Sequence, residues 1–351
     1  MTTLSSARVA IVGATGYTGS ELVRLLSSHP LVEIAAITSR SRAGEAFSSI
    51  HPAFRGVCDQ PLSRIEDLPD DLDAILLALP HGASMDFVAA HPMDGPPVID
   101  LSGDFRLADA GLYARWYGQE HRAADRLQGA VFGLPELFRE TMAGARLVAN
   151  PGCYPTAAIL ALAPLLRRGL VRTDGLVVDA KSGVTGAGAT AKAATHFPDL
   201  FGDFRAYGLL SHRHTPEIEA ALGRVAGGAV QVLFTPHLLP VDRGILATCY
   251  AQPAADLARP LDAEQVAAAY AEDYLAEPFV RWTEGAPAIK PVRGSNFCDV
   301  HATYDPRTDR VIALAAIDNL VKGAAGQAVQ NLNLICGWPE TTGLEQGPLS
   351  P

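Results

Sequence analysis

The sequence predicts an α/β protein whose first half is a parallel sheet covered by helices on both faces. Short apolar runs at residues 8–12, 32–37, 73–79 and 97–101 alternate with helical stretches, and a glycine-rich loop follows the first run. Near-continuous apolar strands of this kind are typical of parallel sheets that are buried on both faces. Because 351 residues exceed the usual size of one domain, we also expect a second domain.

The composition excludes several classes of partner and compartment. A net charge of −10 offers no basic stripe for a nucleic acid. Residues 1–7 form a polar lead without the features of an export signal, and no apolar run reaches membrane-spanning length. Five scattered cysteines without a C-x-x-C pair indicate reduced thiols rather than a disulfide framework or a zinc site. We therefore expect a cytoplasmic protein with no membrane or nucleic-acid partner.

The loop after the first strand has the spacing G-x-x-G-x-x-G and precedes a helix with leucines on one face. Glycines here let the backbone turn and approach a pyrophosphate, whose charge the helix N-terminus stabilises. The spacing is a variant of the dinucleotide fingerprint, and it predicts a Rossmann-type doubly wound domain. Alternatively, the glycines only pack the helix against the strand. The predicted phosphate-binding residues are Gly13, Thr15, Gly16, Tyr17, Thr18 and Gly19.

The loops after the second and third strands complete the predicted cofactor site. Ser39, Arg40 and Arg42 stand where an NAD-specific site carries an acidic residue, and hydroxyls with guanidinium groups suit a 2′-phosphate. The cofactor is therefore predicted to be NADP, and the alternative is a solvated surface loop. Pro80 and His81 follow the third strand, where the nicotinamide half should pass, but His81 is given no chemical role.

Cys153 has the setting of a nucleophile. It follows a strand-like run at 147–149 and precedes an apolar helix predicted from 157 to about 166, broken or bent at Pro164. Pro155 fits the first helical turn, so Cys153 lies at a helix N-terminus, where the dipole favours the thiolate. Cys58, Cys249, Cys298 and Cys336 lack such a setting and are interpreted as packing residues.

A thiolate nucleophile needs a proton partner, and the segment His212-Arg213-His214 before a predicted helix is the best candidate. The two histidines could also form half of a metal site, but His237 and His301 are remote in sequence, so no metal is predicted. The residues alone do not decide which of the two histidines transfers the proton.

Two further features suit an anionic substrate. Arg106 follows the fourth strand, at the edge where ligands bind, and a guanidinium matches phosphate or carboxylate. Its alternative role is an ion pair with Asp104 or Asp109. The second feature is a glycine-rich loop at 181–188, after a strand at 176–180. Its N–H groups near Ser182 and Gly183 could approach a cofactor or an acyl oxygen.

These motifs stand in an order that resembles the N-acetyl-gamma-glutamyl-phosphate reductase family, arginine-pathway enzymes related to aspartate-semialdehyde dehydrogenase. The resemblance covers nearly the whole chain. Its most specific parts are Pro151-Gly152-Cys153-Tyr154-Pro155-Thr156 and His212-Arg213-His214-Thr215-Pro216-Glu217-Ile218. Lys181 departs from the pattern, because a smaller apolar residue is expected there, and it could alter a local anion site.

The resemblance implies a role for each part of the chain. It makes Cys153 the nucleophile and His212 the acid/base, and it puts Arg106, Arg213 and His214 near the substrate. It implies an NADP-binding domain at 1–152, completed by 319–351 with Asn319 near the nicotinamide. A catalytic α+β domain at 153–318, with an antiparallel sheet, would make the subunit contacts of a homodimer or homotetramer.

The reaction that the resemblance implies begins when the Cys153 thiolate expels phosphate from an acyl phosphate and forms a thioester. Hydride from NADPH then gives a thiohemiacetal that collapses to the aldehyde. A close alternative is the reductase of carrier-linked aminoadipyl phosphate in lysine synthesis. An alternative of another class is a non-catalytic NADP-binding redox sensor. Short-chain reductases are excluded, because no tyrosine has a lysine four residues later.

Overall fold

A computed structural model describes residues 5–349 and divides into two compact units. The first unit is Met1–Gly152 with Ala324–Gln346, and the second is Cys153–Gly323 with Gly347–Pro351. Of the polar lead expected at residues 1–7, residues 1–4 lie outside the described part, as do 350 and 351 at the other end. The C-terminal segment that belongs to the first unit begins at Ala324 in this division, whereas it was expected to begin at Asn319. The assignment of functional domains stays a prediction.

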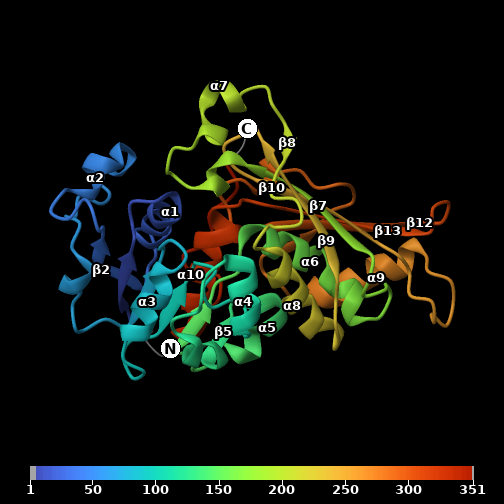
Figure 1. Ribbon diagram of the computed structural model, residues 1–351, viewed down its shortest axis with the longest axis horizontal. Helices are drawn as coiled ribbons and strands as arrows, with labels where there is room; N and C mark the ends of the chain where they lie inside the picture. The colour runs from blue at the N-terminus through green and yellow to red at the C-terminus, as the bar shows by residue number, and fades with distance from the viewer. Residues whose placement is uncertain (1–4, 350–351) are drawn as a thin grey trace. The chain divides into compact units, whose positions relative to one another are not determined.

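The first unit contains a six-stranded sheet of order β2-β1-β3-β4-β6-β5, with every neighbouring pair parallel (Figure 1). Its strands are β1 (Ala7–Val12), β2 (Val32–Thr38), β3 (Ala74–Leu77), β4 (Val98–Asp100), β5 (Ala130–Phe132) and β6 (Leu147–Ala149). The predicted α/β doubly wound sheet is confirmed. β5 was not predicted, because three residues at a sheet edge, two of them part-exposed, show too little apolar pattern.

The strand order fixes where a ligand binds in this unit. β1 lies between β2 and β3, so the chain leaves β1 toward one side of the sheet and returns to its other side. At such a switch point the loops after β1 and β3 leave a crevice at the carboxyl ends of the strands. The glycine loop at 13–19 and the loop at 79–82 therefore border one crevice.

The helices of the first unit are α1 (Tyr17–Leu26), α2 (Phe47–Ile50), α3 (Ala83–Ala90), α4 (Ala110–Tyr117), α5 (Pro135–Phe138) and α10 (Gly326–Ile335). α10 packs beside α1 and contacts β4. Its Asn331 is fully buried and donates to the carbonyl of Gly133 (2.9 Å) and to the side chain of Asn150 (3.0 Å). The returning helix thereby supports the residues just before Cys153.

The second unit contains a seven-stranded sheet of order β11-β12-β13-β10-β7-β9-β8. The strands are β7 (Leu176–Gly183), β8 (Arg205–Ala206), β9 (Val232–Leu239), β10 (Ile245–Ala251), β11 (Val280–Trp282), β12 (Cys298–Asp305) and β13 (Arg310–Ile317). The predicted α+β character is confirmed, but the sheet is mixed rather than antiparallel. β7 pairs with β9, and β11 with β12, in parallel. A parallel neighbour needs a long crossover, and α8 (Thr215–Ala226) lies in the connection from β7 to β9.

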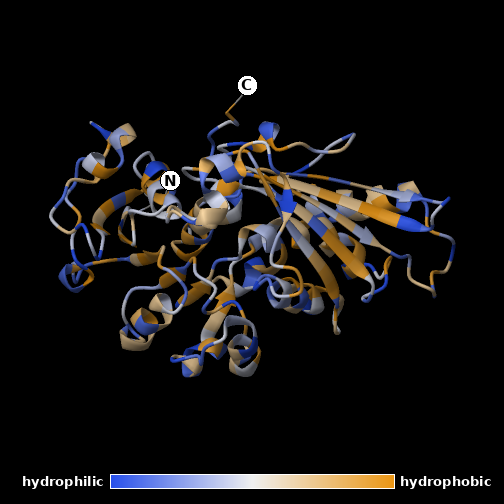
Figure 2. Ribbon diagram, turned by 45° about the horizontal axis from the view of Figure 1, so that its top comes forward, coloured by the Kyte–Doolittle hydropathy of each residue, from blue (hydrophilic) through white to orange (hydrophobic). Residues whose placement is uncertain are grey.

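Helix α6 (Cys153–Arg167) forms the core of this unit. Every residue from Tyr154 to Leu166 is buried, against α8, α9 (Ala263–Tyr274) and the strands β10 and β13. Figure 1 shows these helices along one face of the sheet, and Figure 2 shows long hydrophobic stretches on its strands. Among the described residues, no helix is both long and apolar enough to span a membrane.

The helix predicted from 157 to about 166 starts earlier, at Cys153, and continues through Pro164 to Arg167. Pro164 has no N–H for the carbonyl of Leu160, one turn earlier. The hydroxyl of Tyr274 on α9 donates to that carbonyl at 2.8 Å, and Tyr270 donates to the next one, of Ala161. A break at Pro164 is therefore wrong, because side chains of α9 satisfy the carbonyls that the proline leaves exposed, and the bend predicted as its alternative stays a prediction.

We expect Tyr274→Phe to destabilise the protein by about 1–3 kcal/mol, the usual cost of a buried polar group without a partner. The free energy of unfolding, measured in urea, checks this. In a Pro164→Ala background the restored N–H can bond Leu160, so the same change should cost less. An equal loss in both backgrounds would contradict the role assigned to Tyr274.

Candidate active site

The surroundings of the three glycines of the first loop differ. A Cβ on Gly13, whose φ is +88°, would lie 2.6 Å from the carbonyl oxygen of Ala78, and one on Gly19 would lie 2.4 Å from that of Gly13. A Cβ on Gly16 would meet no atom within 4 Å. Close packing therefore explains Gly13 and Gly19 but not Gly16. Gly16 caps α1 without a side-chain hydrogen bond, so no side chain of the cap occupies the open space beside it at the N-terminus of the helix.

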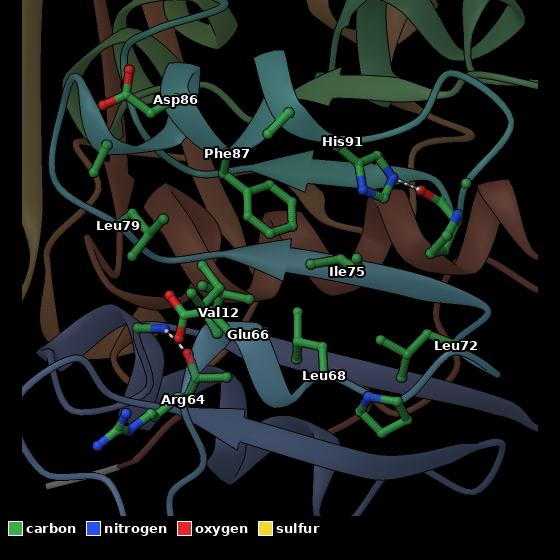
Figure 3. Close-up of a pocket in the computed structure, with 18 of the residues that line it drawn as sticks. Val12, Arg64, Glu66, Leu68, Leu72, Ile75, Leu79, Asp86, Phe87 and His91 are labelled. Carbon is green, nitrogen blue, oxygen red and sulfur yellow. Dashed lines mark hydrogen bonds between the residues drawn. The ribbon is translucent and has the colours of Figure 1, made fainter.

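A cavity of about 930 Å³ in the first unit opens at Gly13 and Thr38 and runs along the face of β3. Figure 3 shows Leu72, Ile75 and Phe87 around its apolar interior, and Arg64 lies toward the end where Gly13 and Thr38 are, because Ser63 pairs with Thr38. Such a shape suits a flat, partly apolar group with a polar end.

Two guanidinium groups, of Arg40 and Arg64, line this cavity, and among the described residues neither has an ion pair. Arg42 does not line it; its guanidinium is bidentate to Glu45, with a 2.6 Å bond between Nη2 and Oε2. Ser39 is buried, and its N–H donates to the carbonyl of Ser63 (3.1 Å), which brings Arg64 beside the end of β2. Sequence reasoning missed Arg64, because nothing in the local pattern signals this backbone pairing.

The loop after β3 is held by Asp104. Its buried carboxylate accepts from the N–H of Gly82 (2.8 Å), the N–H of Met85 (3.1 Å) and the hydroxyl of Tyr113 (2.9 Å). Pro80 and His81 are exposed, and Nδ1 of His81 accepts from the N–H of Gly103 (2.8 Å). These bonds fix the loop at the crevice, where the sequence placed it.

Arg106 is held at the same edge of the sheet. Its Nε donates to the carbonyl of Asn150 and its Nη2 to that of Leu101, both at 2.8 Å. The two carboxylates considered as partners make bonds of their own: Asp104 accepts from the loop after β3, and Asp109 accepts from the N–H of Leu112 (2.6 Å) at the start of α4. Backbone carbonyls at the ends of β4 and β6 thus orient the guanidinium.

Cys153 is the first residue of α6 and is half-buried. None of the five cysteines, all of which lie in the described part, forms a disulfide. Burial raises the pKa of Cys249 to about 12 and that of Cys336 to about 11, so these thiols stay protonated. A helix N-terminus instead favours the thiolate of Cys153.

The two histidines lie in a turn, not in an extended segment. The N–H of Thr215 donates to the carbonyl of His212 (3.0 Å), and the N–H of His214 donates to Nδ1 of His212 (3.2 Å). Their rings are nevertheless only 4.8 Å apart, centre to centre, and both meet the ring of Tyr154, at 5.7 and 6.0 Å. The residue after the nucleophile therefore holds both histidines near the start of α6, while Arg213 between them is exposed.

Three aromatic rings border the half-buried His212 and lower its pKa. Tyr154, Tyr207 and Phe234 meet it edge to face, at 5.2–5.7 Å. This burial, with a smaller contribution from Arg213, lowers the pKa of His212 to about 4, so the ring is neutral at physiological pH. Because Nδ1 accepts a backbone N–H, the neutral ring carries its proton on Nε2 and offers it as a donor.

Two phenols beside this histidine form a short chain of hydrogen bonds. Tyr207 donates to the hydroxyl of Tyr154 (3.2 Å), which donates to the carbonyl of His237 (3.0 Å). Partial burial raises the pKa of Tyr207, which is still 37% exposed, to about 12, and full burial raises that of Tyr154 further still. Both phenols therefore stay protonated, and they position His212 rather than exchange protons with it.

The strand predicted at 176–180 extends to Gly183, so Ser182 and Gly183 are the last residues of β7 and the glycine-rich loop starts only at residue 184. A Cβ on Gly183 would lie 2.8 Å from the carbonyl oxygen of Asp242, so a close backbone approach requires glycine there; Ser182 beside it is buried. Asn319 accepts from the N–H of Gly244 (2.8 Å) and donates to the hydroxyl of Thr185 (3.0 Å). Asn319 thus ties the end of β13 to this loop within the second unit.

Lys181, the departure from the family pattern, has an ordinary structural setting. Its Nζ lies 3.0 Å from the carboxylate of Asp179 and 3.4 Å from the hydroxyl of Thr248, on neighbouring positions of β7 and β10. The side chain is therefore engaged on the sheet and paired with an acid.

Comparison with known proteins gives the family. The chain is 50% identical to an N-acetyl-gamma-glutamyl-phosphate reductase of Pelotomaculum thermopropionicum, over 98% of this chain and 99% of that protein. It is 52% identical to the protein of the same name from Desulforudis audaxviator, over 96% and 97%. The chain belongs to the N-acetyl-gamma-glutamyl-phosphate reductase family. Family models also match, a semialdehyde dehydrogenase NAD binding domain at 8–145 and a semialdehyde dehydrogenase dimerisation domain at 153–319.

Solved structures agree on the fold. An aspartate semialdehyde dehydrogenase from Vibrio cholerae has a TM-score of 0.72 at 18% identity, covering 94% of this chain and 98% of that one. The enzyme of the same name from Candida albicans, solved with NADP, has a TM-score of 0.70 at 16% identity, covering 94% and 98%. At such identities the likeness shows a shared fold.

We expect Gly16→Ala to fold normally but to bind a nicotinamide dinucleotide at least about tenfold more weakly, because the new methyl group enters only the space left for phosphate. Gly19→Ala, the matched control, should cost about 1–3 kcal/mol of stability because its methyl group overlaps backbone. Urea unfolding and dinucleotide titration of both variants measure this. Unchanged dinucleotide affinity in Gly16→Ala would remove the loop from the phosphate site.

Proposed function

We propose that this chain uses NADPH to reduce N-acetyl-gamma-glutamyl phosphate to N-acetylglutamate 5-semialdehyde and phosphate, a step of arginine biosynthesis. The observation that supports this most is the start of α6. There a half-buried cysteine at a helix N-terminus has two histidines beside the next residue, in a chain about half identical to reductases of that name. A free thiol nucleophile needs a reducing compartment, so we place the reaction in the cytoplasm.

The first unit fits NADP on two observations. The N-terminus of α1 faces open space at Gly16, where a pyrophosphate could lie against N–H groups. Arg40 and Arg64 line a neighbouring cavity whose apolar interior suits adenine, and guanidinium groups suit a 2′-phosphate. Gly13, Thr15, Tyr17, Thr18, Ser39, Pro80 and His81 would surround the dinucleotide in the first unit, with Ser182, Gly183 and Asn319 toward the nicotinamide.

The covalent steps take place on Cys153. Its thiolate attacks the acyl carbon, a C–S bond forms, and phosphate leaves with the electron pair of the C–O bond. Bound NADPH supplies a hydride. Cys153 then holds a thiohemiacetal, which collapses as the C–S electrons return to sulfur and the aldehyde is released. The dipole of α6 stabilises the thiolate at the start and at the end of this sequence.

His212 acts on the oxygen of the reacting carbonyl. Its neutral ring presents Nε2–H, a donor that can stabilise the negative charge developing on that oxygen and exchange a proton with it. The aromatic rings around it shield one side of the ring from water and restrict its orientation. We assign Arg106, Arg213 and His214 to the anionic groups of the substrate, and Arg42 to a lesser part in cofactor binding because Glu45 holds it.

We also propose that the chain forms a homodimer or homotetramer through its second unit. The helices cover one face of the seven-stranded sheet, and large apolar side chains such as Leu233 and Tyr250 are exposed on its strands. The family model matched at 153–319 is described as a dimerisation domain. A second copy would bury this apolar surface.

The function is tested by the reverse reaction, phosphate-dependent reduction of NADP. N-acetylglutamate semialdehyde should be oxidised with a kcat/KM at least about tenfold above that of its homologue one methylene longer, because a fitted pocket discriminates by about 1–3 kcal/mol per methylene. Preference for the longer homologue would indicate the aminoadipyl reaction of lysine synthesis. No turnover with either aldehyde, despite NADPH binding, would indicate a sensor.

We expect Cys153→Ala to lose nearly all turnover while its affinity for NADPH is unchanged, because the sulfur forms the thioester and the dinucleotide loop is elsewhere. Cys336→Ala, which removes a thiol outside the site, is the control and should retain activity. Steady-state kinetics and NADPH titration measure both. A Cys153→Ala variant with more than about a tenth of the parental kcat would exclude the covalent mechanism.

We expect NADPH to be preferred over NADH, and Arg40→Ala and Arg64→Ala each to weaken NADPH by about tenfold or more, since each removes a charged contact to phosphate. NADH affinity should change little. Arg42→Ala is the matched control and should have a smaller effect, because its guanidinium pairs with Glu45. Fluorescence titration with both dinucleotides distinguishes the cases. Equal kcat/KM for NADPH and NADH in the parent would overturn the assignment.

We expect His212→Asn to lower kcat by about a hundredfold or more, the usual scale for a general acid/base, and His214→Asn to act on KM or stability. Because burial lowers the pKa of His212 to about 4, its limb in the pH profile of kcat/KM should lie near pH 4 and vanish in His212→Asn. The reverse pattern in the two variants would transfer the role to His214.

The lowered pKa of His212 also makes the free energy of unfolding depend on pH. The folded protein favours the neutral His212 ring, so this contribution is complete above the ordinary pKa of about 6.5 and declines as the pH falls toward 4. Urea unfolding at several pH values should therefore show a weaker decline below pH 6.5 in His212→Asn than in the parent.

A further inference from the structure

The end of β13 leads into a segment that one buried carboxylate holds in place. Asp318 follows the last residue of β13 and is fully buried. Its Oδ1 accepts from the N–H of Leu320 (2.8 Å) and of Val321 (3.2 Å), and its Oδ2 accepts from the N–H of Gly294 (2.7 Å). Arg243 lies 3.5 Å from the same carboxylate. Such a set of donors fixes the backbone after the strand.

This segment forms one turn of π-helix, η8 (Val321–Ala325). The N–H of Gly323 donates to the carbonyl of Asp318 (2.9 Å), five residues earlier. Lys322 is fully buried, with its ammonium group 5.6 Å from the centre of the Phe279 ring. A π-turn is less stable than an α-turn and persists where its surroundings require it, frequently at functional sites.

Gly323 touches the nucleophile. A Cβ on Gly323 would lie 2.8 Å from Cβ of Cys153, 3.1 Å from its Cα and 3.3 Å from Cδ1 of Ile317. The backbone of Gly323 does not have a positive φ, so its conformation alone would accept any residue. The glycine is therefore needed for the space that Cys153 occupies.

Cys153 lies at a position where a neighbouring rigid group can stabilise it. The rest of α6 is locked by burial, but its first residue has no preceding turn to hold it, and helix ends are the first parts to fray. A displacement of about 1 Å at a reacting atom can cost about a hundredfold in rate. A rigid surface against Cα and Cβ would fix the point from which the sulfur extends.

We propose that Gly323, held by Asp318 in the π-turn, is a positioning residue that sets the place of the Cys153 sulfur. The proposal rests on the proposed function only in taking Cys153 as the nucleophile. The added methyl group of an alanine at 323 would push Cys153 by a few tenths of an ångström or more, since neither its Cα nor its Cβ is the end of a flexible chain.

The experiment compares Gly323→Ala with Gly285→Ala, whose added Cβ would meet nothing within 4 Å in an exposed loop. We expect Gly323→Ala to lower kcat by about tenfold to a hundredfold with KM for NADPH within about twofold of the parent. The pH profile of Cys153 alkylation by iodoacetamide, followed by peptide mass spectrometry, should also shift. Gly285→Ala should match the parent in every measurement.

A second variant provides a rescue. Ile317→Val removes Cδ1, which would lie 3.3 Å from the new methyl group, and so gives the methyl group room to move off Cys153. Gly323→Ala with Ile317→Val should therefore regain part of kcat and most of the parental alkylation profile. Ile317→Val alone should change kcat less than about twofold.

Three results would overturn the proposal. The first is a parental kcat and alkylation profile in Gly323→Ala, and the second is a general loss in that variant, in which NADPH affinity and melting temperature fall together with kcat. The third is that Ile317→Val does not rescue Gly323→Ala. Alkylation needs neither substrate nor cofactor, so it reports on the sulfur even if the chain acts on another acyl phosphate. If the proposed substrate proved wrong, the alkylation profile would therefore still test the role of Gly323.

Discussion

The chemistry of this protein depends on one helix that is both the core of the second unit and the carrier of its nucleophile. Because α6 is buried from Tyr154 to Leu166, the place of Cys153 follows from the packing of the whole unit. α8 and β13 both pack on α6. His212 and His214 precede α8, and the π-turn follows β13. Because both elements pack on α6, the packing of this one helix positions the histidines and the π-turn near Cys153.

Burial also decides the protonation states around the sulfur. The aromatic rings that border His212 reduce its contact with water, so the ring stays neutral, and the two phenols near it stay protonated. The backbone N–H on Nδ1 then determines which nitrogen carries the proton. The site therefore offers a hydrogen-bond donor without a second positive charge beside the exposed Arg213, which suits an oxygen that gains negative charge during the reaction.

Much of this could be predicted from the sequence, because its strongest signals are local. The strands of the first sheet, the glycine loop and the cysteine at a helix start all depend on short spacing rules. Close contacts between distant segments leave no such signal. Arg64 joins the cavity only because Ser63 pairs with the end of β2, and the helix passes Pro164 only because α9 supplies two hydroxyls.

The glycines show most clearly what a sequence pattern does not distinguish. From the sequence, Gly13, Gly16 and Gly19 are equivalent members of one motif, and Gly183 belongs to another. In the structure, backbone atoms of other residues require Gly13, Gly19 and Gly183, whereas the space beside Gly16 is empty. A spacing pattern indicates where glycines are needed, but only the neighbouring atoms show whether a ligand or the protein itself needs them.

The burial of α6 also determines how this protein can move. Hydrogen exchange of the amides from Tyr154 to Leu166, in a helix packed on all sides, requires opening of the whole cooperative unit, so the body of α6 behind Cys153 belongs to the least mobile part of the second unit. Motions that admit substrate and release aldehyde must therefore belong to the exposed segments around it, such as residues 197–210 with Phe197, Phe201 and Leu210 at the surface. Because Cys153 begins this helix, opening of the unit that contains α6 would also displace the thiol.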